Sequence, residues 1–393
     1  MATQSAVEET RRCLNNIERF DSLVNAYIVV VAESARKEAE PIDQAREQGI
    51  SNGVLNGIPI SVKDCIDVAG IPCTNGSRFF EDYVPEEDAL IVQRLRKAGA
   101  VILGKTNLHE FAYGSTTQNP HYGSTRNPWN LDRIPSGSSG GAGASVAAQM
   151  CVGAVGSDTG GSVRTPAAIN GVTGLRPSMG SIPMTGSYTR ICPAIDTVGP
   201  LGANVEIVAR MFVAMAGYDD QDLYSVKKEQ PEILDSLDHG IEGCRIGLPR
   251  QFFLENLEEG VGSAVEAGAH KLAELGAEIV EVELKGAEYA QQSVMPMVWA
   301  DAYEYHRDRA ENSPERFGRD VLDRILLGRE ISGRDYAAAL RARESWNRTI
   351  DRTLEQVDVI LTPTTPITAP SIEESGDMLS TTHHLTRFTY LFS

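Results

Sequence analysis

Two serine–glycine tracts in the middle of the chain carry the residue types that nucleophilic catalysis needs. Residues 136–145 read SGSSGGAGAS and residues 156–162 read GSDTGGS, with one short apolar segment between them. Serine is a weak nucleophile until a neighbouring group takes its proton. The glycines before Ser162 also fit a simple turn, but they allow several backbone N–H groups to point at one spot. We take Ser162 as a candidate nucleophile and expect an oxyanion hole at Thr159, Gly160, Gly161 and Ser162.

Glycine-rich loops can also cradle phosphate groups, because their backbone N–H groups bind anions. A phosphate-binding P-loop requires a lysine directly after its last glycine, and no lysine follows these glycines. A dinucleotide site requires G-x-G-x-x-G between a strand and a helix, and residues 140–143 (GGAG) fit that pattern poorly. Because neither motif is matched, a phosphate-binding function is disfavoured.

A serine–histidine–aspartate hydrolase is a second alternative, and it would place its serine in a G-x-S-x-G elbow. The first tract misses this elbow by one residue, and the second lacks the closing glycine. His109 and His121 are near the tracts without an obvious acidic partner, and His383 and His384 form a pair near the end of the chain. A surface or core role is more common for such histidines than catalysis.

Lysine can replace histidine as the base when it is held neutral. Burial lowers the pKa of a lysine by disfavouring the ammonium form. Lys63 ends the apolar run Ile58–Lys63, which delivers its side chain into the interior. A lysine at the end of a strand is more often a solvated surface residue, so the lysine alone is weak evidence.

Alternating helical and apolar segments must position these residues. We expect helices over residues 3–20, over residues 34–47 with Pro41 as a kink or break, over residues 89–98, and over residues 261–275. We expect strands over residues 58–63, 101–104, 278–282 and 357–361. Residues 113–145 form a long Gly-, Ser- and Asn-rich loop whose aromatic residues argue against disorder. Residues 316–356 are predicted to be mostly helical.

This alternation predicts an α/β fold, with a large mixed sheet covered by helices on both faces. We expect one domain over residues 1–393. Its parts are N-terminal helices over residues 1–50, a core over residues 55–215, a helix-rich part over residues 216–356 and an incomplete C-terminal part over residues 357–393. The sequence shows neither an internal repeat nor a low-complexity linker.

Composition restricts the classes of function. The chain has 393 residues and a formal net charge of −18, and a field of that sign repels phosphate backbones and anionic membrane surfaces. It contains no apolar run of 18 residues and no signal-peptide pattern. The six cysteines are scattered and show no zinc-ligand spacing. We expect a cytoplasmic protein that does not act on membranes and does not bind nucleic acid directly.

The residues from Pro135 to Ser178 resemble the signature of the amidase signature family, in which G-G-S-S-G-G and an Ala-rich helix precede G-[ST]-D-x-G-G-S-[IV]-R-x-P. Ser138 and Ser162 are 24 positions apart and Lys63 is 75 positions before Ser138, as in that family. Further runs that look like the family are GIPISVKD, VILGKTNLHEFAYGSTTQNPHYGSTRNPWN, GPLGANVEIVARMFVAMAGYDDQD and DVILTPTTP. The resemblance covers most of the chain from about residue 55.

The resemblance implies a catalytic role for three residues. Ser162 would attack the amide and form an acyl-enzyme, Ser138 would relay the proton from a cis peptide Gly137–Ser138, and Lys63 would be the terminal base. It also implies that Ser157 joins this network and that Asp158 and Arg164 brace the loop. Substrate contacts are expected at Tyr113, Gly114 and Ser115. The resemblance implies no metal and no organic cofactor.

The chain departs from the family pattern at two places. Ser136 replaces the first glycine of the first tract, which exchanges one small residue for another. The chain stops at LTRFTYLFS, where family members continue, so we expect a shortened C-terminal end.

The resemblance leaves three hypotheses for function. The first is a stand-alone amidase that acts on a small-molecule amide, ureide or carbamate, as a monomer or a homodimer. The second is the A subunit of a tRNA-dependent amidotransferase, which releases ammonia from glutamine. Such subunits place an acidic residue shortly before Phe388-Thr389 to hold the glutamine amine, and Thr386 and Arg387 stand there, which argues against glutamine. The third is a non-catalytic family member. We expect the first.

Overall fold

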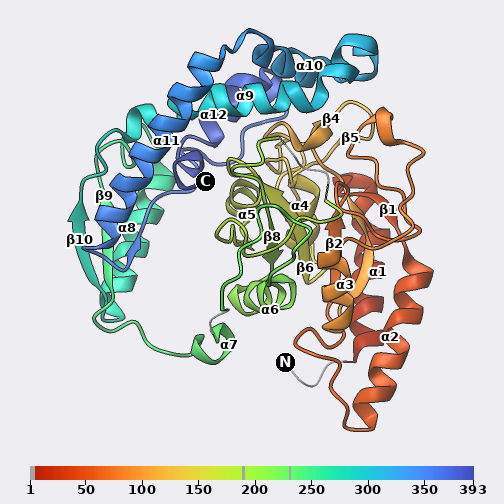
Figure 1. Cartoon of the computed structure of the whole chain (residues 1–393). Coiled ribbons are helices and arrows are strands. Elements are labelled where there is room, and N and C mark those ends of the chain that lie inside the picture. Colours follow the sequence, from red (N-terminus) through yellow and green to blue (C-terminus); the bar gives the residue numbers. More distant parts are fainter. Residues whose placement is uncertain (1–4, 188–190, 230–231) are drawn as a thin grey trace.

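The computed structural model describes residues 5–187, 191–229 and 232–393, and a six-stranded mixed sheet forms its centre (Figure 1). The strand order is β1-β3-β2-β6-β8-β7. Strand β2 is parallel to both β3 and β6, whereas β1, β8 and β7 run antiparallel to their neighbours. The strands are β1 Tyr27–Val30, β2 Pro59–Lys63, β3 Val101–Thr106, β6 Gly153–Asp158, β7 Thr173–Gly174 and β8 Thr197–Gly202.

Helices cover both faces of this sheet, as the sequence predicts. One face of the sheet, to which Val101 and Leu103 of β3 contribute, is covered by three helices. These are α1 (Ala6–Val24), α2 (Ala32–Glu47) and α4 (Gly140–Ala147). Helices α3 (Leu90–Lys97) and α6 (Val205–Met215) pack on the other face, where Ile102 lies. The alternation of these three β3 residues between two cores follows from the two-residue period of a strand.

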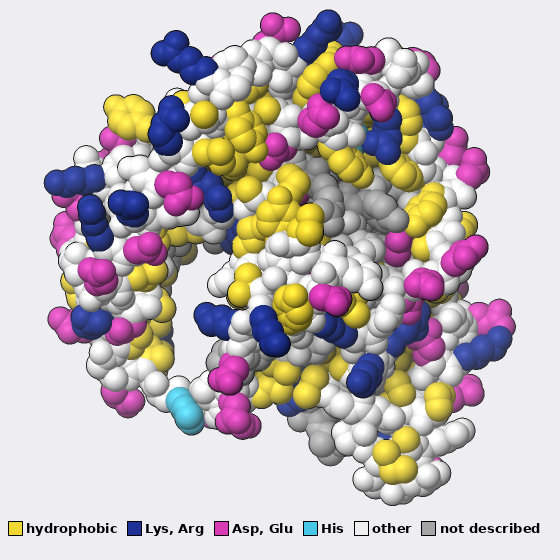
Figure 2. Space-filling model, viewed as in Figure 1, with side chains coloured by type: hydrophobic (Ala, Val, Ile, Leu, Met, Phe, Trp, Pro, Cys, Tyr) yellow, Lys and Arg dark blue, Asp and Glu magenta, His cyan; other side chains and the backbone are white. Residues whose placement is uncertain are grey.

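A second, three-stranded parallel sheet lies beyond residue 240, with the order β10-β9-β11. Its strands are β9 Arg245–Pro249, β10 Glu278–Val282 and β11 Val359–Ile360, and α8 (Glu259–Glu274) packs beside them. Figure 2 shows an opening between the part of the molecule that carries this sheet and the central body. The expected mixed sheet is therefore confirmed, and the predicted strands at residues 278–282 and 357–361 lie in this second sheet. The assignment of residues 1–393 to one domain stays a prediction.

Two long helices of the helix-rich part, with two short helices beside them, lie over the upper side of the central sheet in Figure 1. These are α9 Ala287–Asn312, α10 Arg319–Leu326, α11 Gly333–Leu354 and α12 Met378–Leu385. The remaining helices are α5 Arg164–Asn170 and α7 Ile233–Ser236, and the short hairpin pairs β4 Gln118–Asn119 with β5 Gly123–Ser124. Six 3₁₀ turns complete the described part: η1 Arg78–Phe80, η2 Glu110–Ala112, η3 Pro314–Arg316, η4 Leu327–Glu330, η5 Glu374–Gly376 and η6 Thr389–Phe392.

Most predicted elements form within a few residues of their expected bounds. The helix expected from residue 3 starts at Ala6 behind an N-cap at Ser5, whose hydroxyl accepts from the Glu8 N–H, while residues 3 and 4 lie outside the described residues. Pro41 does not divide α2, because Ala32–Glu47 is one helix. The loop expected over residues 113–145 contains the β4–β5 hairpin and the first turn of α4. Among the described residues, no helix is both long and apolar enough to cross a bilayer.

Candidate active site

The side chain of Lys63 is fully buried at the end of β2 and is surrounded by serine hydroxyls. Its Nζ lies 2.7 Å from Ser138 Oγ, 2.9 Å from Ser139 Oγ and 2.8 Å from Ser157 Oγ. Burial lowers the pKa of Lys63 from its usual value to about 8, although Asp158 and Asp196 lie near enough to oppose that shift. A neutral amine has two N–H groups and one lone pair, so one of the three hydroxyls has to donate to it.

Parallel pairing brings these groups together. Strands β2 and β6 run side by side in the same direction, with Val62 opposite Val155. Lys63 and Ser157 are therefore neighbours at the carboxyl ends of their strands, which is where α/β sheets usually carry their sites. Ser138 and Ser139, which directly precede α4, lie at the same edge. The peptide bond Gly137–Ser138 is cis, as the family resemblance implies.

Ser162 lies beside this buried cluster and is partly exposed. The N–H of Ser139 donates to the Ser162 carbonyl at 3.3 Å, which holds the two serine tracts together. The Ser162 hydroxyl makes no hydrogen bond to any described residue, and it faces a pocket. The structure therefore places Ser138 on Lys63 and Ser162 next to that pair. The hydrogen bond between the two serine hydroxyls, which a proton relay needs, is not formed.

Asp158 holds the loop that carries Ser162. Its carboxylate accepts from the N–H groups of Gly161 at 2.8 Å and Val163 at 3.1 Å, and from the guanidinium of Arg164 at 2.8 and 3.0 Å. Arg176 also contacts it at 3.2 Å. Burial alone would raise the pKa of Asp158, but the two guanidiniums and the N–H groups hold it well below its usual value. Asp158 and Arg164 therefore have the contacts of bracing residues, as expected.

The expected oxyanion hole needs one correction. The N–H of Gly161 is engaged by Asp158 and is not available to a substrate. The N–H groups of Thr159, Gly160 and Ser162 make no hydrogen bond to described residues, so they are free donors of this loop. Thr159 donates its hydroxyl to Asp196 at 2.6 Å, and burial raises the pKa of Asp196 to about 7. Gly160 packs on a tyrosine: a Cβ at that position would lie 2.1–2.4 Å from the ring of Tyr390.

A pocket opens at Ser162, and all three expected substrate contacts, at Tyr113, Gly114 and Ser115, line it. Its free volume is only ≈ 20 Å³, about the space of one water. The other lining residues are Ala112, Thr159, Gly160, Ile191, Arg324, Thr382, Thr386 and Tyr390. Most of those that sequence reasoning missed come from between residues 191 and 390, and no local pattern marks them as part of a site.

Arg324 is the most informative of the missed residues. It is 4% exposed, and its guanidinium carbon lies 4.1 Å from the centre of the Tyr113 ring. It donates to the Tyr113 carbonyl at 3.3 Å, while its Nε has no hydrogen-bond partner in the described part of the chain. No carboxylate pairs with it among the described residues. A buried cation without a counter-charge is costly, so this pocket offers a favourable place for an anionic group.

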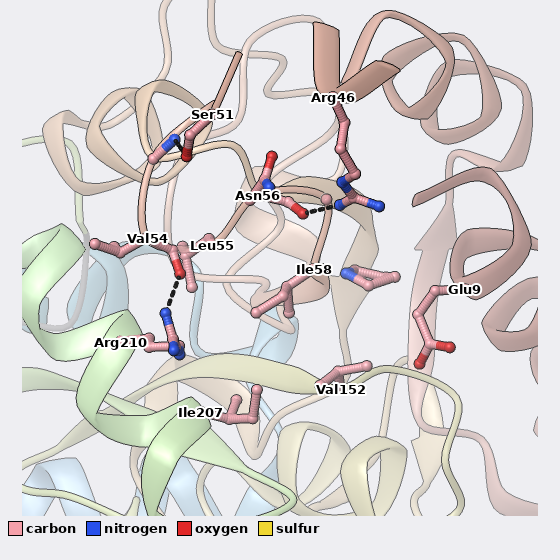
Figure 3. A pocket seen from close by; sticks show the side chains of 13 residues that line it. Glu9, Arg46, Ser51, Val54, Leu55, Asn56, Ile58, Val152, Ile207 and Arg210 are labelled. Carbon is pink, nitrogen blue, oxygen red and sulfur yellow. Dashed lines mark hydrogen bonds between the residues drawn. The ribbon is translucent and has the colours of Figure 1, made fainter. Parts of the chain in front are cut away.

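A larger cavity lies at the other end of the sheet and is separate from the serines (Figure 3). It is bounded by Pro59, which starts β2, and by Val152, which precedes β6. The two arginines that line it donate to backbone carbonyls of the adjacent loop, Arg46 to Asn56 at 2.7 Å and Arg210 to Val54 at 3.1 Å. Ser162 therefore lines the narrow pocket, and Lys63, Ser138 and Ser162 are absent from the lining of this cavity.

Comparison with known proteins agrees with this architecture. The chain belongs to the amidase family, because the model of the family described as Amidase matches residues 8–392. Among its relatives is the A subunit of glutamyl-tRNA(Gln) amidotransferase from Carboxydothermus hydrogenoformans, which is 38% identical over 96% of this chain and 82% of the relative. The corresponding protein of Halorhodospira halophila is also 38% identical, over 95% of this chain and 82% of the relative.

Solved structures give the same family. One is described as a vestigial protein complex that reveals the evolutionary origins of an s-triazine catabolic enzyme; it has a TM-score of 0.91 and 34% identity and covers 99% of this chain and 85% of its own. The A subunit of glutamyl-tRNA(Gln) amidotransferase from Thermotoga maritima has a TM-score of 0.83 and 32% identity over 98% of this chain and 82% of its own. A structure described as an amidase has a TM-score of 0.84 and 29% identity, and covers 98% of this chain and 87% of its own.

These relatives correct the expected partners. We expected a chain that acts by itself or as a homodimer on a small amide, without nucleic acid. That expectation is wrong, because the curated relatives are named as subunits of an amidotransferase of glutamyl-tRNA(Gln), and a neighbour in structure is described as a protein complex. The comparisons establish an amidase-family enzyme and favour the amidotransferase hypothesis over the stand-alone one.

Proposed function

We propose that this chain is the amide-cleaving subunit of a multi-subunit enzyme and that Ser162 forms the acyl-enzyme. The observation that carries the proposal is the buried Lys63 amine, which lies 2.7 Å from Ser138 Oγ and pairs with no carboxylate of the described residues. In the neutral form this amine accepts the proton of Ser138, which in turn takes the proton of Ser162 as that hydroxyl attacks. The same proton then returns through Ser138 to the leaving nitrogen.

The first step needs a movement of the Ser162 side chain. Ser162 Oγ is free of hydrogen bonds to described residues and has to turn toward Ser138 Oγ. Contacts in such sites are often long before substrate binds and tighten in the substrate complex. The developing oxyanion would be stabilised by the N–H groups of Gly160 and Ser162, which have no other partner in the described part of the chain. The ammonia leaves as the acyl-enzyme forms, and in a multi-subunit enzyme it passes to a partner protein. Water then hydrolyses the acyl-enzyme and regenerates the Ser162 hydroxyl.

Glutamine is the first amide to test, because the relatives at 38% identity are named as subunits of an amidotransferase of glutamyl-tRNA(Gln). Ammonia release should be measured on the chain alone and with co-expressed partner subunits, in the presence of glutamine and charged tRNA. Glutamine-dependent amidation that appears only with the partners supports this assignment. Glutamine turnover that never exceeds the background of Ser162→Ala would contradict it.

A second candidate substrate is an amide that carries a negative charge but no ammonium group. The pocket holds the cation of Arg324 and, among the described residues that line it, no carboxylate that could hold an ammonium. Glutaramate, the half-amide of glutaric acid, is glutamine without its ammonium group and tests this directly. We expect glutaramate to be cleaved faster than glutamine, and faster than butyramide, which lacks both charges. A preference for glutamine would exclude this candidate.

The nucleophile can be tested without knowing the substrate. A fluorophosphonate probe should add once to the protein, at Ser162, with the added mass seen by intact mass spectrometry and located by peptide mapping. Ser162→Ala should remain unlabelled and lose amide cleavage by a factor on the order of 10⁴ or more. Ser345→Ala, at an exposed position on α11, is the matched control and should behave as the parent. Labelling at another serine would contradict the assignment.

A further inference from the structure

Two consecutive buried residues, His109 and Glu110, both reach across the molecule to the start of α10. His109 Nε2 lies 3.0 Å from Asp320 Oδ2, and Glu110 Oε2 accepts from the N–H of Gly318 at 2.7 Å. Both partners are more than 200 positions away along the chain. We call His109 and Glu110, together with their contacts to Gly318 and Asp320, the α10 clamp.

The main chain of His109 also contacts the segment that carries Ser138, while its side chain lies outside the pocket lining. The N–H of His109 donates to the carbonyl of Ser138 at 3.2 Å. This bond fixes the start of the turn η2, which follows His109, to the serine that contacts Lys63. The turn then leads directly into the pocket residues Tyr113 and Gly114. A Cβ at Gly114 would lie 2.4–2.6 Å from the His109 ring, so this part of the wall has no free space beside the imidazole.

The far end of α10 returns to the pocket. Arg324 is four residues after Asp320, which places both side chains on one face of the helix. Arg324 lies over the Tyr113 ring at 4.1 Å and donates to the Tyr113 carbonyl at 3.3 Å. The clamp therefore holds Asp320 at the start of one helical turn of α10. The end of that turn carries Arg324, whose guanidinium is the cation of the pocket.

The helix depends on such contacts because it is short. Helix α10 has 8 residues, and its N-cap Gly318 offers no side chain to cap it. Helices of this length gain most of their stability from tertiary contacts. The Glu110 carboxylate supplies a partner for the Gly318 N–H, and a Cβ at Gly318 would lie 2.9 Å from Glu110 Oε2, so a residue without a side chain allows this close approach.

We propose that the α10 clamp is a specificity-positioning device: His109 and Asp320 set the place of the Arg324 guanidinium beside Ser162, and thereby the preference for an anionic amide. This proposal rests on the proposed function and on its second candidate substrate. The clamp residues touch no reacting atom; they act through Arg324. Loss of the clamp then weakens the recognition of the anionic group and leaves the reaction at Ser162 in place.

The recognition of the anionic group is measured by how well an amide protects Ser162 from labelling by a fluorophosphonate probe. The concentration that halves the labelling rate is determined for glutaramate and for butyramide, on the parent and on Asp320→Ala and His109→Ala. In the parent we expect glutaramate to protect at lower concentration than butyramide. In both variants labelling of Ser162 continues, butyramide protects as before, and glutaramate loses about tenfold in effectiveness, the weight of one hydrogen bond to a charged group.

Two further variants separate positioning from general damage. Asp320→Asn keeps an acceptor oxygen for His109 and should retain most of the preference for glutaramate. Asp335→Ala removes an equivalent carboxylate from the first turn of α11, where it caps the helix with Ser332, and should leave the preference unchanged. Asp320 is partly exposed, so its variants test the proposal even if His109→Ala does not fold.

The outcomes are distinct. If glutaramate protects Asp320→Ala as well as it protects the parent, the proposal is overturned. Equal weakening of glutaramate and butyramide also overturns it, because the clamp is then only structural. A parent that is labelled at Ser162 but shows no preference for glutaramate overturns the inference alone. A parent that is never labelled at Ser162 overturns the proposed function instead.

Discussion

At the scale of single residues, the site is built around a lysine that pairs with no carboxylate of the described residues. Its hydrogen-bond partners there are all hydroxyl groups, and burial is the first cause of the lowered pKa of Lys63. Lys105, on the neighbouring strand, is buried as deeply but pairs with Asp64 at 2.8 Å, and its pKa is raised. Of these two lysines, Lys63 is the one that can serve as a base near neutral pH.

The pKa of Lys63 predicts how the rate depends on pH. The amine is a base only when neutral, and with a pKa of about 8 its neutral fraction rises as the pH increases through 8. The rate of acylation of Ser162 should therefore rise between about pH 7 and 9 and level off above that range. Stopped assays of fluorophosphonate labelling from pH 6 to 10 measure this profile.

The matched variants for this profile are Lys63→Met and Lys97→Met. Lys63→Met should lower the rate by about 10²–10⁴-fold, the usual contribution of a general base, and flatten the profile. Lys97 is exposed at the end of α3, and its variant should keep both the rate and the profile. A Lys63→Met enzyme with the parent's rise through pH 8 would show that another group is the base.

At the scale of elements, the buried pair Lys105–Asp64 joins the end of β3 to the residue that follows β2. Both side chains are fully buried, and Asp64 also accepts from the N–H of Thr74 at 2.9 Å. Burial alone would lower the pKa of Lys105, but the carboxylate of Asp64 keeps it above its usual value. The pair therefore fixes the position of the strand end that carries Lys63.

Removing one partner of this pair should be costly. Lys105→Met leaves the Asp64 carboxylate buried without its counter-charge, which typically costs about 3–5 kcal/mol of the free energy of unfolding. Urea unfolding followed by circular dichroism measures this loss. The double variant Lys105→Met/Asp64→Leu should recover a large part of it, because an apolar pair has no charge to desolvate.

An exposed lysine provides the control for this measurement. Lys271 pairs with Glu274 at 3.0 Å on the surface of α8, and Lys271→Met should leave the unfolding midpoint nearly unchanged. If Lys105→Met were as stable as Lys271→Met, the buried pair would not hold the two strand ends together.

At the scale of the whole molecule, the pocket is formed by residues that are far apart in the sequence. The serine tracts and Tyr113 come from the central body, Arg324 comes from α10, and Thr386 follows α12. Thr386 is buried and accepts from Gln291 at 3.0 Å. Selectivity therefore depends on how the helix-rich part sits over the sheet, and a change in that part should alter which amide is preferred.

A single carboxylate placed in this wall should change the preference. Thr386→Asp adds a negative charge to a pocket whose described lining carries the Arg324 cation, and it supplies a partner for the ammonium group of glutamine. We expect the rate ratio of glutamine to glutaramate to rise by about tenfold or more. Ammonia release from each amide measures the ratio. Ser380→Asp, exposed on α12, is the control and should leave the ratio unchanged.

Much of the fold could be predicted from the sequence, because its helices and strands depend on local patterns, while the assignment of the reacting groups stays a proposal. The strand at Glu278–Val282 forms with the expected bounds, and the helix over residues 89–98 forms as Leu90–Lys97. Division into two sheets was not predicted. Strand β11 pairs with β9, more than 100 positions away, and local periodicity does not report which strand pairs with which.

The sequence by itself determined the local features on which the proposed chemistry depends. These are the spacing of Lys63, Ser138 and Ser162, and the glycines that let a loop approach them closely. Only the tertiary structure decided what surrounds that chemistry. It directs the Gly161 N–H to Asp158, turns the Ser162 hydroxyl toward the pocket, and places Arg324 beside Tyr113. The contact of Arg324 with Tyr113 joins residues more than 200 positions apart and arises from packing of α10 beside residues 109–115, which no local sequence pattern encodes. The bond from Gly161 to Asp158 spans three positions, but the motif alone does not report which N–H group the carboxylate engages.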